Sequence, residues 1–341
     1  MLRRTFRTFK WAMSPYASTE KKRLLLIYDF ASQPFSLGDI LIFQEAALVL
    51  RDKHRLSAID LALVYDPANP VVSDPAFAHI GPENFLVHLT SILPAAQINP
   101  HLGSLLLFDS HRRLEIFVSD NIDEYFVWPS LADYVSREYL FYECFNRIFA
   151  EHHAKHGSLP ALRSRPAIAD WAKQFLQLHC GGMTPVSVQL RRNPATPARN
   201  SDYDSWLGFF SDSARRYPAK FFVICSATEV VPALRGLPNV VVAKDHYTTL
   251  EQDLALIEAC SIHMGPSSGP GTMAMFNERP YCMFGFDTSP QLIDGFIQEE
   301  HRVRYPFAKP DQYWIRENET RELIEQEFSR LWAGIARGKP V

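Results

Sequence analysis

The stretch that decides the fold is MGPSSGPGTMA, residues 264–274, which lies between a short apolar run and a helical pattern. Its glycines allow a ligand to approach the backbone closely. Backbone N–H groups and two serine hydroxyls would face an anion at the positive end of the following helix, an arrangement that favours phosphate. The alternative is an ordinary strand-to-helix turn that uses serine and glycine as cap and turn residues.

Apolar runs and helical patterns alternate on both sides of this stretch. Such alternation predicts βαβ units, and therefore parallel sheets with helices on their faces. The segment 157–166, rich in proline and arginine, predicts a linker between two such units. The expected strands are 24–28, 59–65, 105–108, 114–118, 186–190, 221–225, 240–242, 262–264 and 281–284. The expected helices are 40–53, 131–153, 169–178, 206–217, 230–235, 250–260, 272–276 and 319–337.

Residues 248–285 resemble the donor-domain core of the bacterial heptosyltransferases, because a leucine-rich helix, the glycine-rich stretch and the segment PYCMFG follow one another in the family's order. The resemblance implies an α/β chain of the GT-B class, with two Rossmann-like parallel-sheet domains facing a cleft. The N-terminal domain, 20–160, would bind the acceptor. The C-terminal domain, 167–315, would bind the nucleotide sugar, and the helix 319–337 would pack back across the domains.

In that family the glycine-rich loop binds the nucleotide pyrophosphate. The resemblance assigns this role to Ser267, Ser268, Gly269 and Thr272. The chain departs from the family pattern at two of these positions. Ser267 stands where an aspartate is usual, and Thr272 stands where a histidine is usual.

A pair of arginines, Arg191 and Arg192, follows the strand expected at 186–190. Planar guanidinium groups match phosphate oxygens in a bidentate way, so the pair could grip a diphosphate. The segment is similar to an arginine motif of fucosyltransferases, with Gln189 in place of the motif's histidine. The alternative is two exposed loop arginines. Lys244, at the end of the strand expected at 240–242, is a further candidate for nucleotide binding.

The N-terminal half offers candidate proton acceptors. The segment SLGD follows the first strand and ends at Asp39, and its similarity to a heptosyltransferase motif implies that this carboxylate is the catalytic base. The alternative is a helix cap, a common role for aspartate. The segment DSHRR, residues 109–113, offers His111 or Asp109 as another base, or it is a hairpin loop between two strands. Asp29, just after the apolar core of the first strand, is a lesser candidate for the base and is interpreted as structural.

Composition narrows the possible partners. The chain has 341 residues and a formal net charge of −3, which gives no general reason to expect nucleic acid. Its five cysteines are odd in number and widely spaced, so we expect reduced thiols in a cytoplasmic protein. The basic N-terminus predicts a solvated tail or weak peripheral contact with an anionic membrane. No apolar run approaches the ~20 residues that cross a bilayer.

These observations predict a glycosyltransferase that moves a sugar from a GDP-, ADP- or UDP-sugar to a glycan or other hydroxyl acceptor, including a lipid-linked one. The arginines would neutralise the departing diphosphate, so we expect transfer without a metal cofactor. We also expect inversion at the anomeric carbon. The acidic DYD segment, residues 202–204, is interpreted as a helix start rather than a metal site. Two alternatives stay open. One is a sugar-nucleotide epimerase, and the other is a non-catalytic relative that binds nucleotide sugars or glycans.

Overall fold

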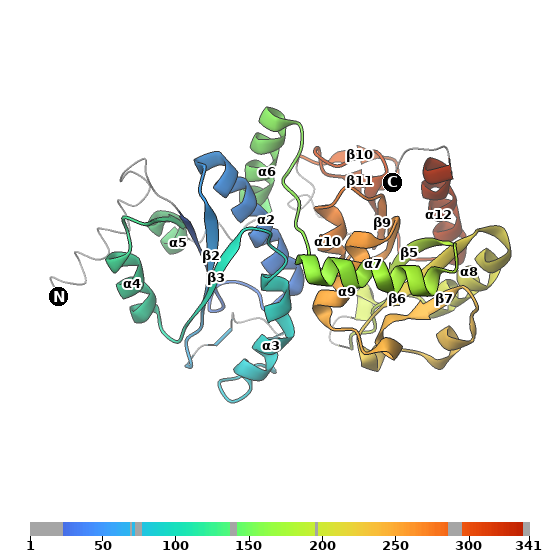
Figure 1. Cartoon of the computed structure of the whole chain (residues 1–341), viewed down its shortest axis with the longest axis horizontal. Coiled ribbons are helices and arrows are strands. Elements are labelled where there is room, and N and C mark those ends of the chain that lie inside the picture. Colours follow the sequence, from blue (N-terminus) through green and yellow to red (C-terminus); the bar gives the residue numbers. More distant parts are fainter. Residues whose placement is uncertain are drawn as a thin grey trace. The chain divides into compact units, whose positions relative to one another are not determined.

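The structure is a computed structural model, and it describes residues 23–68, 70–71, 77–136, 142–194, 197–285 and 295–336 (Figure 1). The chain divides into two compact units, Met1–Leu162 and Arg163–Val341. The basic N-terminal segment that was interpreted as a tail lies outside the described residues. In the described part, no helix combines the length and the apolar character needed to cross a bilayer. Cys180, Cys225, Cys260 and Cys282 are buried free thiols, as expected.

The first unit is built on a parallel sheet with the strand order β3-β2-β1-β4. Strands β1 and β2 are almost completely buried, because a parallel sheet carries helices on both faces. This explains why they read as continuous apolar runs in the sequence. The strands are β1 (Arg23–Asp29), β2 (Ala58–Val64), β3 (Leu102–Phe108) and β4 (Tyr125–Trp128). The helices are α2 (Leu37–His54), α3 (Phe85–Ala96), α4 (His111–Asp120), α5 (Leu131–Ser136) and α6 (Tyr142–His156).

One predicted strand is wrong, because residues 114–118 belong to helix α4. The side chain of Ser110 caps this helix by accepting the backbone N–H of Arg113. Leu114 and Val118, four residues apart, lie on one face and are buried against β1 and β2. Residues 109–113 are therefore the start of a helix and not a hairpin loop.

The second unit contains a larger sheet, which in the described residues has the strand order β10-β11-β12-β9-β8-β5-β6-β7. Six neighbouring strands, from β12 to β7, run parallel. Their chain order across the sheet is 6-5-4-1-2-3, the order of a doubly wound nucleotide-binding sheet. The strands are β5 (Thr184–Gln189), β6 (Ala219–Ile224), β7 (Val240–Val242), β8 (Ile262–Pro266), β9 (Tyr281–Phe284), β10 (Ile297–Glu299), β11 (Arg302–Arg304) and β12 (Gln312–Ile315).

Helices cover both faces of this sheet (Figure 1). Helices α8 and α12 contribute to an aromatic core on one face, in which Trp206, Phe209 and Phe328 are fully buried. The segment predicted as a helix at 230–235 is a short 3-10 turn, Pro232–Gly236. The α-helices are α7 (Pro166–Cys180), α8 (Tyr203–Arg216), α9 (Leu250–Ala259), α10 (Thr272–Met275) and α12 (Arg321–Ala336).

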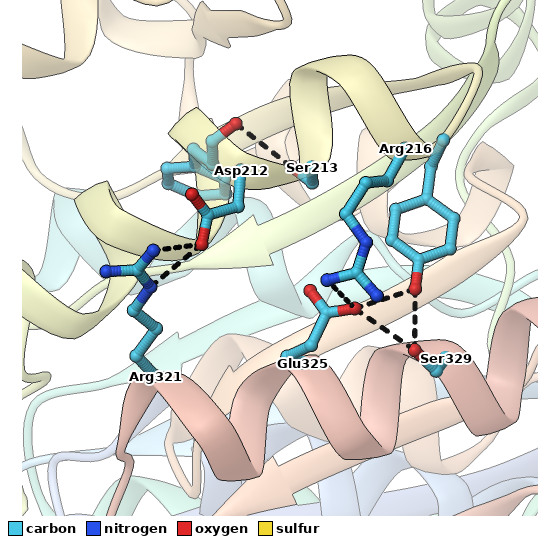
Figure 2. Close-up of polar contacts among 8 residues, drawn as sticks. Asp212, Ser213, Arg216, Arg321, Glu325 and Ser329 are labelled. Carbon is cyan, nitrogen blue, oxygen red and sulfur yellow. Dashed lines mark hydrogen bonds and ion pairs between the residues drawn. The ribbon is translucent and has the colours of Figure 1, made fainter.

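Helix α12 is tied to α8 by two ion pairs (Figure 2). Arg321 pairs with Asp212, and Arg216 pairs with Glu325 at 2.8 Å. The Tyr217 hydroxyl donates to Glu325 at 2.7 Å, which links the end of α8 to the middle of α12. These contacts fasten α12 to its own unit. Packing of this helix across both domains stays a prediction.

The antiparallel strands β10 and β11 were not predicted. A buried carboxylate joins β11 and the neighbouring β12 to α12. Glu327 is fully buried and receives hydrogen bonds from the Arg302 guanidinium at 2.7 Å and from the Tyr313 hydroxyl at 2.8 Å. These hydrogen bonds lower the pKa of Glu327 despite its burial, which acts in the opposite direction. The final helix is therefore fixed to the edge of the sheet by charge as well as by apolar packing.

Candidate functional site

The candidate site lies where the strand order of the second sheet reverses. After β5 the next strands, β6 and β7, are added on one side of it, whereas β8 lies on its other side and is followed outward by β9. Ligands of doubly wound sheets bind outside the carboxyl ends of the strands at such a switch point. The glycine-rich stretch follows β8, and the two predicted arginines follow β5. Both segments therefore reach the same edge of the sheet, as the sequence predicts.

Strands β5 and β8 approach each other closely at this edge. Gly265 has φ +146°, and a Cβ atom at this position would lie 2.5 Å from the carbonyl oxygen of Gln189. The Ser268 hydroxyl donates a hydrogen bond to the side-chain oxygen of Gln189. Glycine is thus required at position 265 for a steric reason. Ser268, one of the two predicted serines, is held in place by Gln189, which stands where the fucosyltransferase motif has a histidine.

The loop after β5 folds back on itself and brings a third arginine to the site. The backbone N–H of Ser201 donates to the carbonyl of Arg191 at 2.9 Å, and the Ser201 hydroxyl accepts the N–H of Arg191 at 3.1 Å. This closure places Arg199 beside the glycine-rich stretch, where its guanidinium donates to the carbonyl oxygen of Ser267 at 2.7 Å. The sequence interpretation missed Arg199.

Two of the three arginines in this loop, Arg191 and Arg199, lie near enough for their charges to interact. Burial lowers the pKa of the Arg191 guanidinium, and the nearby charge of Arg199 lowers it further. Glu229 acts in the opposite direction. An anion bound between the two guanidinium groups would relieve their repulsion and form charge-assisted hydrogen bonds with both.

A pocket of about 420 Å³ opens beside these residues. It is lined by the loop after β5, by the ends of β8 and β9, and by the segment before α12. Glu319 belongs to this lining, and its carboxylate accepts the backbone N–H of Asp202 at 2.7 Å, at the start of α8. Burial raises the pKa of Glu319 to about 7. The lining residues are Pro197, Arg199, Asn200, Ser201, Asp202, Pro266, Ser267, Phe284, Gly285, Asn318 and Glu319.

The predicted site residues differ in their surroundings. Ser267 lines the pocket, whereas Arg192 is exposed and its backbone N–H donates to Glu229 at 2.7 Å. Lys244 forms an ion pair with Asp253 at 2.5 Å, so its charge already has a partner. The roles assigned to these residues in nucleotide binding stay predictions.

The glycine-rich stretch forms less helix than its pattern suggests. Gly269 begins a 3-10 turn, and α10 is only four residues long. Thr272, the first residue of α10, is 4% exposed and lies beneath the surface of the loop. The site therefore depends on loop backbone and arginine side chains more than on a long helix dipole.

The acidic residues singled out in the sequence lie at helix starts. Asp202 caps α8, because its side chain accepts the backbone N–H of Ser205 at 3.2 Å. This agrees with its interpretation as a helix start. Asp39 is half-buried in the first turn of α2, after the N-cap residue Ser36. Its role as a base stays a prediction. In the described part of the chain, no group of three or more histidine, cysteine, aspartate or glutamate residues could hold a metal ion.

Comparison with known proteins adds the architecture of the whole chain. No protein-family model matches the sequence, and no curated protein sequence matches it. Among solved structures, an ADP-heptose LPS heptosyltransferase II from E. coli aligns with a TM-score of 0.55 and 13% identity, covering 92% of this chain and 99% of the other. The chain has the GT-B fold. A family 9 glycosyl transferase from Veillonella parvula aligns with a TM-score of 0.51 and 12% identity, covering 91% of this chain and 89% of the other.

The E. coli heptosyltransferase WaaC, solved with ADP, also aligns with a TM-score of 0.51 and 12% identity, covering 91% of this chain and 99% of the other. Identities this low bear on the fold alone. The GT-B architecture predicted from the glycine-rich stretch is thus confirmed, and the function must be argued from the site.

Proposed function

We propose that the chain is a glycosyltransferase whose second unit binds a nucleoside-diphosphate sugar. The observation that carries the proposal is the contact of Arg199 with Ser267 of the glycine-rich stretch, beside a pocket at the switch point of the sheet, with Arg191 near enough to Arg199 for their charges to interact. A diphosphate matches two neighbouring guanidinium groups in charge and geometry. The pocket beyond Arg199 is lined by amide and carboxylate side chains, which suit the hydroxyl groups of a ribose or a sugar.

The same groups account for catalysis. Negative charge develops on the diphosphate as its bond to the sugar breaks, and fixed positive charges at that point stabilise the transition state more than the ground state. The arginines would supply this charge without a divalent cation. We further propose transfer with inversion, which needs a base that takes the proton of the acceptor hydroxyl. The proposed acceptor is a hydroxyl group of a glycan or of a lipid-linked molecule. Asp39 is the base that the heptosyltransferase resemblance implies.

The proposal is tested by isothermal titration calorimetry with ADP, GDP and UDP, both free and as sugar conjugates. We expect one nucleotide to bind best, because the pocket has a definite shape. Removing one guanidinium–phosphate contact costs about 1.5–3 kcal/mol, or about 10- to 150-fold in affinity. Arg191→Ala and Arg199→Ala should each show this loss. Arg215→Ala removes an exposed arginine from the end of α8 and serves as the matched control.

Binding that is unchanged in both Arg191→Ala and Arg199→Ala would contradict the diphosphate site. Incubation of the preferred sugar nucleotide with the enzyme alone then addresses the rival chemistry. Release of nucleoside diphosphate supports transfer, here to water, whereas interconversion of the donor sugar would identify an epimerase. A protein that binds the nucleotide sugar without changing it would be a non-catalytic relative.

A further inference from the structure

A second polar centre lies in the first unit, at the carboxyl end of β1. Asp29 ends this strand, is 3% exposed, and accepts three hydrogen bonds. The donors are the His111 ring at 2.8 Å, the backbone N–H of Ala31 at 3.0 Å, and the Tyr134 hydroxyl. These groups come from the start of α4, the turn after β1, and α5, so three parts of the unit converge on one carboxylate.

The orientation of His111 follows from its partner. A carboxylate only accepts hydrogen bonds, so the Nε2 atom that contacts Asp29 carries the hydrogen. In the neutral ring Nδ1 then holds a lone pair. Within the described residues Nδ1 makes no hydrogen bond, and the His111 side chain is 40% exposed. A buried carboxylate thus holds a half-exposed imidazole with one nitrogen available to a ligand.

The position of this pair in the fold matches a substrate site. Asp29 ends β1, His111 follows β3, and Tyr134 follows β4, all at the carboxyl edge of a parallel sheet. This is the edge at which such sheets bind ligands. The charged groups that act on His111 are Asp29, Asp66 after β2, and Glu115 on its own helix, and the Tyr134 hydroxyl donates to the same oxygen of Asp29 as the His111 ring. The hydrogen bond to Asp29 raises the pKa of His111, partial burial opposes this, and the charges of the three acidic residues act with the hydrogen bond, so that the pKa is raised overall.

We infer that His111, oriented by Asp29, accepts the proton of the acceptor hydroxyl, in the role that the heptosyltransferase resemblance implies for Asp39. The inference rests on the proposed glycosyl transfer. As the acceptor oxygen forms its bond to the anomeric carbon, its proton passes to Nδ1 of His111. The bond between the anomeric carbon and the diphosphate oxygen breaks, and its electron pair leaves with the nucleoside diphosphate. Asp29 stabilises the imidazolium that forms and is a positioning residue, in the manner of other carboxylate–imidazole pairs.

The test uses water as the acceptor and the sugar nucleotide that binds best, with release of nucleoside diphosphate measured between pH 5 and 9. A base acts in its unprotonated form, so wild-type kcat should rise with pH through a pKa above the usual 6.5 of histidine. His111→Gln should lower kcat about 10²- to 10⁴-fold and abolish this rise of kcat with pH (the ascending limb of the pH profile), with unchanged affinity for the donor. Asp29→Asn should move the limb to lower pH, because the raising effect of the carboxylate is lost.

A further variant, His111→Gly, distinguishes chemistry from folding, because added imidazole should restore part of its rate. A pH profile and kcat of His111→Gln equal to those of the wild type would overturn the inference, as would loss of the limb in Asp39→Asn alone. The proposed function fails separately, if no sugar nucleotide binds to the wild-type enzyme. Donor binding measured by calorimetry in every variant keeps the two failures apart.

Discussion

The glycine at position 265 provides a sharp test of how the site is built. At φ +146°, an alanine would be strained, and its Cβ atom would lie 2.5 Å from the carbonyl oxygen of Gln189. That oxygen belongs to the backbone of β5, so it cannot change its position by a side-chain rotation. Gly265→Ala must therefore push β8 away from β5 at the switch point of the sheet.

The expected cost has two parts. The strained backbone conformation costs about 1–3 kcal/mol, and the displaced strand weakens hydrogen bonds worth about 1 kcal/mol, which together give about 2–4 kcal/mol. For a unit of this size, 1 kcal/mol corresponds to about 2–4 °C, so Tm should fall by about 4–16 °C. The nucleotide should also bind more weakly, because Ser268 would lose its position beside Gln189.

Differential scanning calorimetry measures the effect, and the chain offers a matched control. Gly334 lies in α12, and an added Cβ there would meet nothing within 4 Å. Gly334→Ala should keep or raise Tm, since alanine favours a helix over glycine by about 0.5–1 kcal/mol. If Gly265→Ala had the same Tm as Gly334→Ala and bound nucleotide as tightly as the wild type does, the close approach of β5 and β8 would not be needed for stability or for binding.

Two further predictions concern stability. His263 is fully buried, and burial lowers its pKa to about 3. Below pH 6.5 the unfolded chain binds a proton that the folded chain does not, so the free energy of unfolding should decrease by up to about 1.4 kcal/mol for each pH unit by which the pH is lowered. His263→Gln should reduce this pH dependence in urea unfolding curves. Glu327→Ala should cost about 3–5 kcal/mol, because Arg302 and Tyr313 lose a buried partner. Arg321→Ala should destabilise the protein much less, because its ion pair is exposed, and equal effects in thermal melts would contradict this ranking.

Most strands of the parallel sheets could be predicted because their residues are buried on both faces. The runs at 24–28, 59–65 and 186–190 correspond to β1, β2 and β5 within a few residues. The run at 114–118 misled the prediction, since alternating apolar residues also fit a short helix whose apolar positions are four apart. The deciding signal was the Ser110 cap. Strands β10 and β11 are three residues long each, too short for any periodicity to be visible.

The site was predictable where its residues are close in sequence. The glycine-rich stretch carries its chemistry within a few positions, so Ser267 was found. Arg199 was not, because its partner Ser267 is 68 residues away and nothing around Arg199 distinguishes it from an ordinary loop arginine. Glu319 contacts Asp202 across 117 residues. Pairings of this kind arise only when the sheet brings the ends of different strands together.

The two sheets differ in how they present their borders to other molecules. In the described residues, the edge strands of the larger sheet are β7 and β10, of three residues each. Edge strands this short offer few free backbone groups for pairing with another chain. The smaller sheet ends in β3, which has seven residues and leaves Leu105 and Leu107 38% and 50% exposed. Self-association at high concentration should therefore begin at β3, and a lysine in place of Leu107 should suppress it while leaving the nucleotide pocket intact.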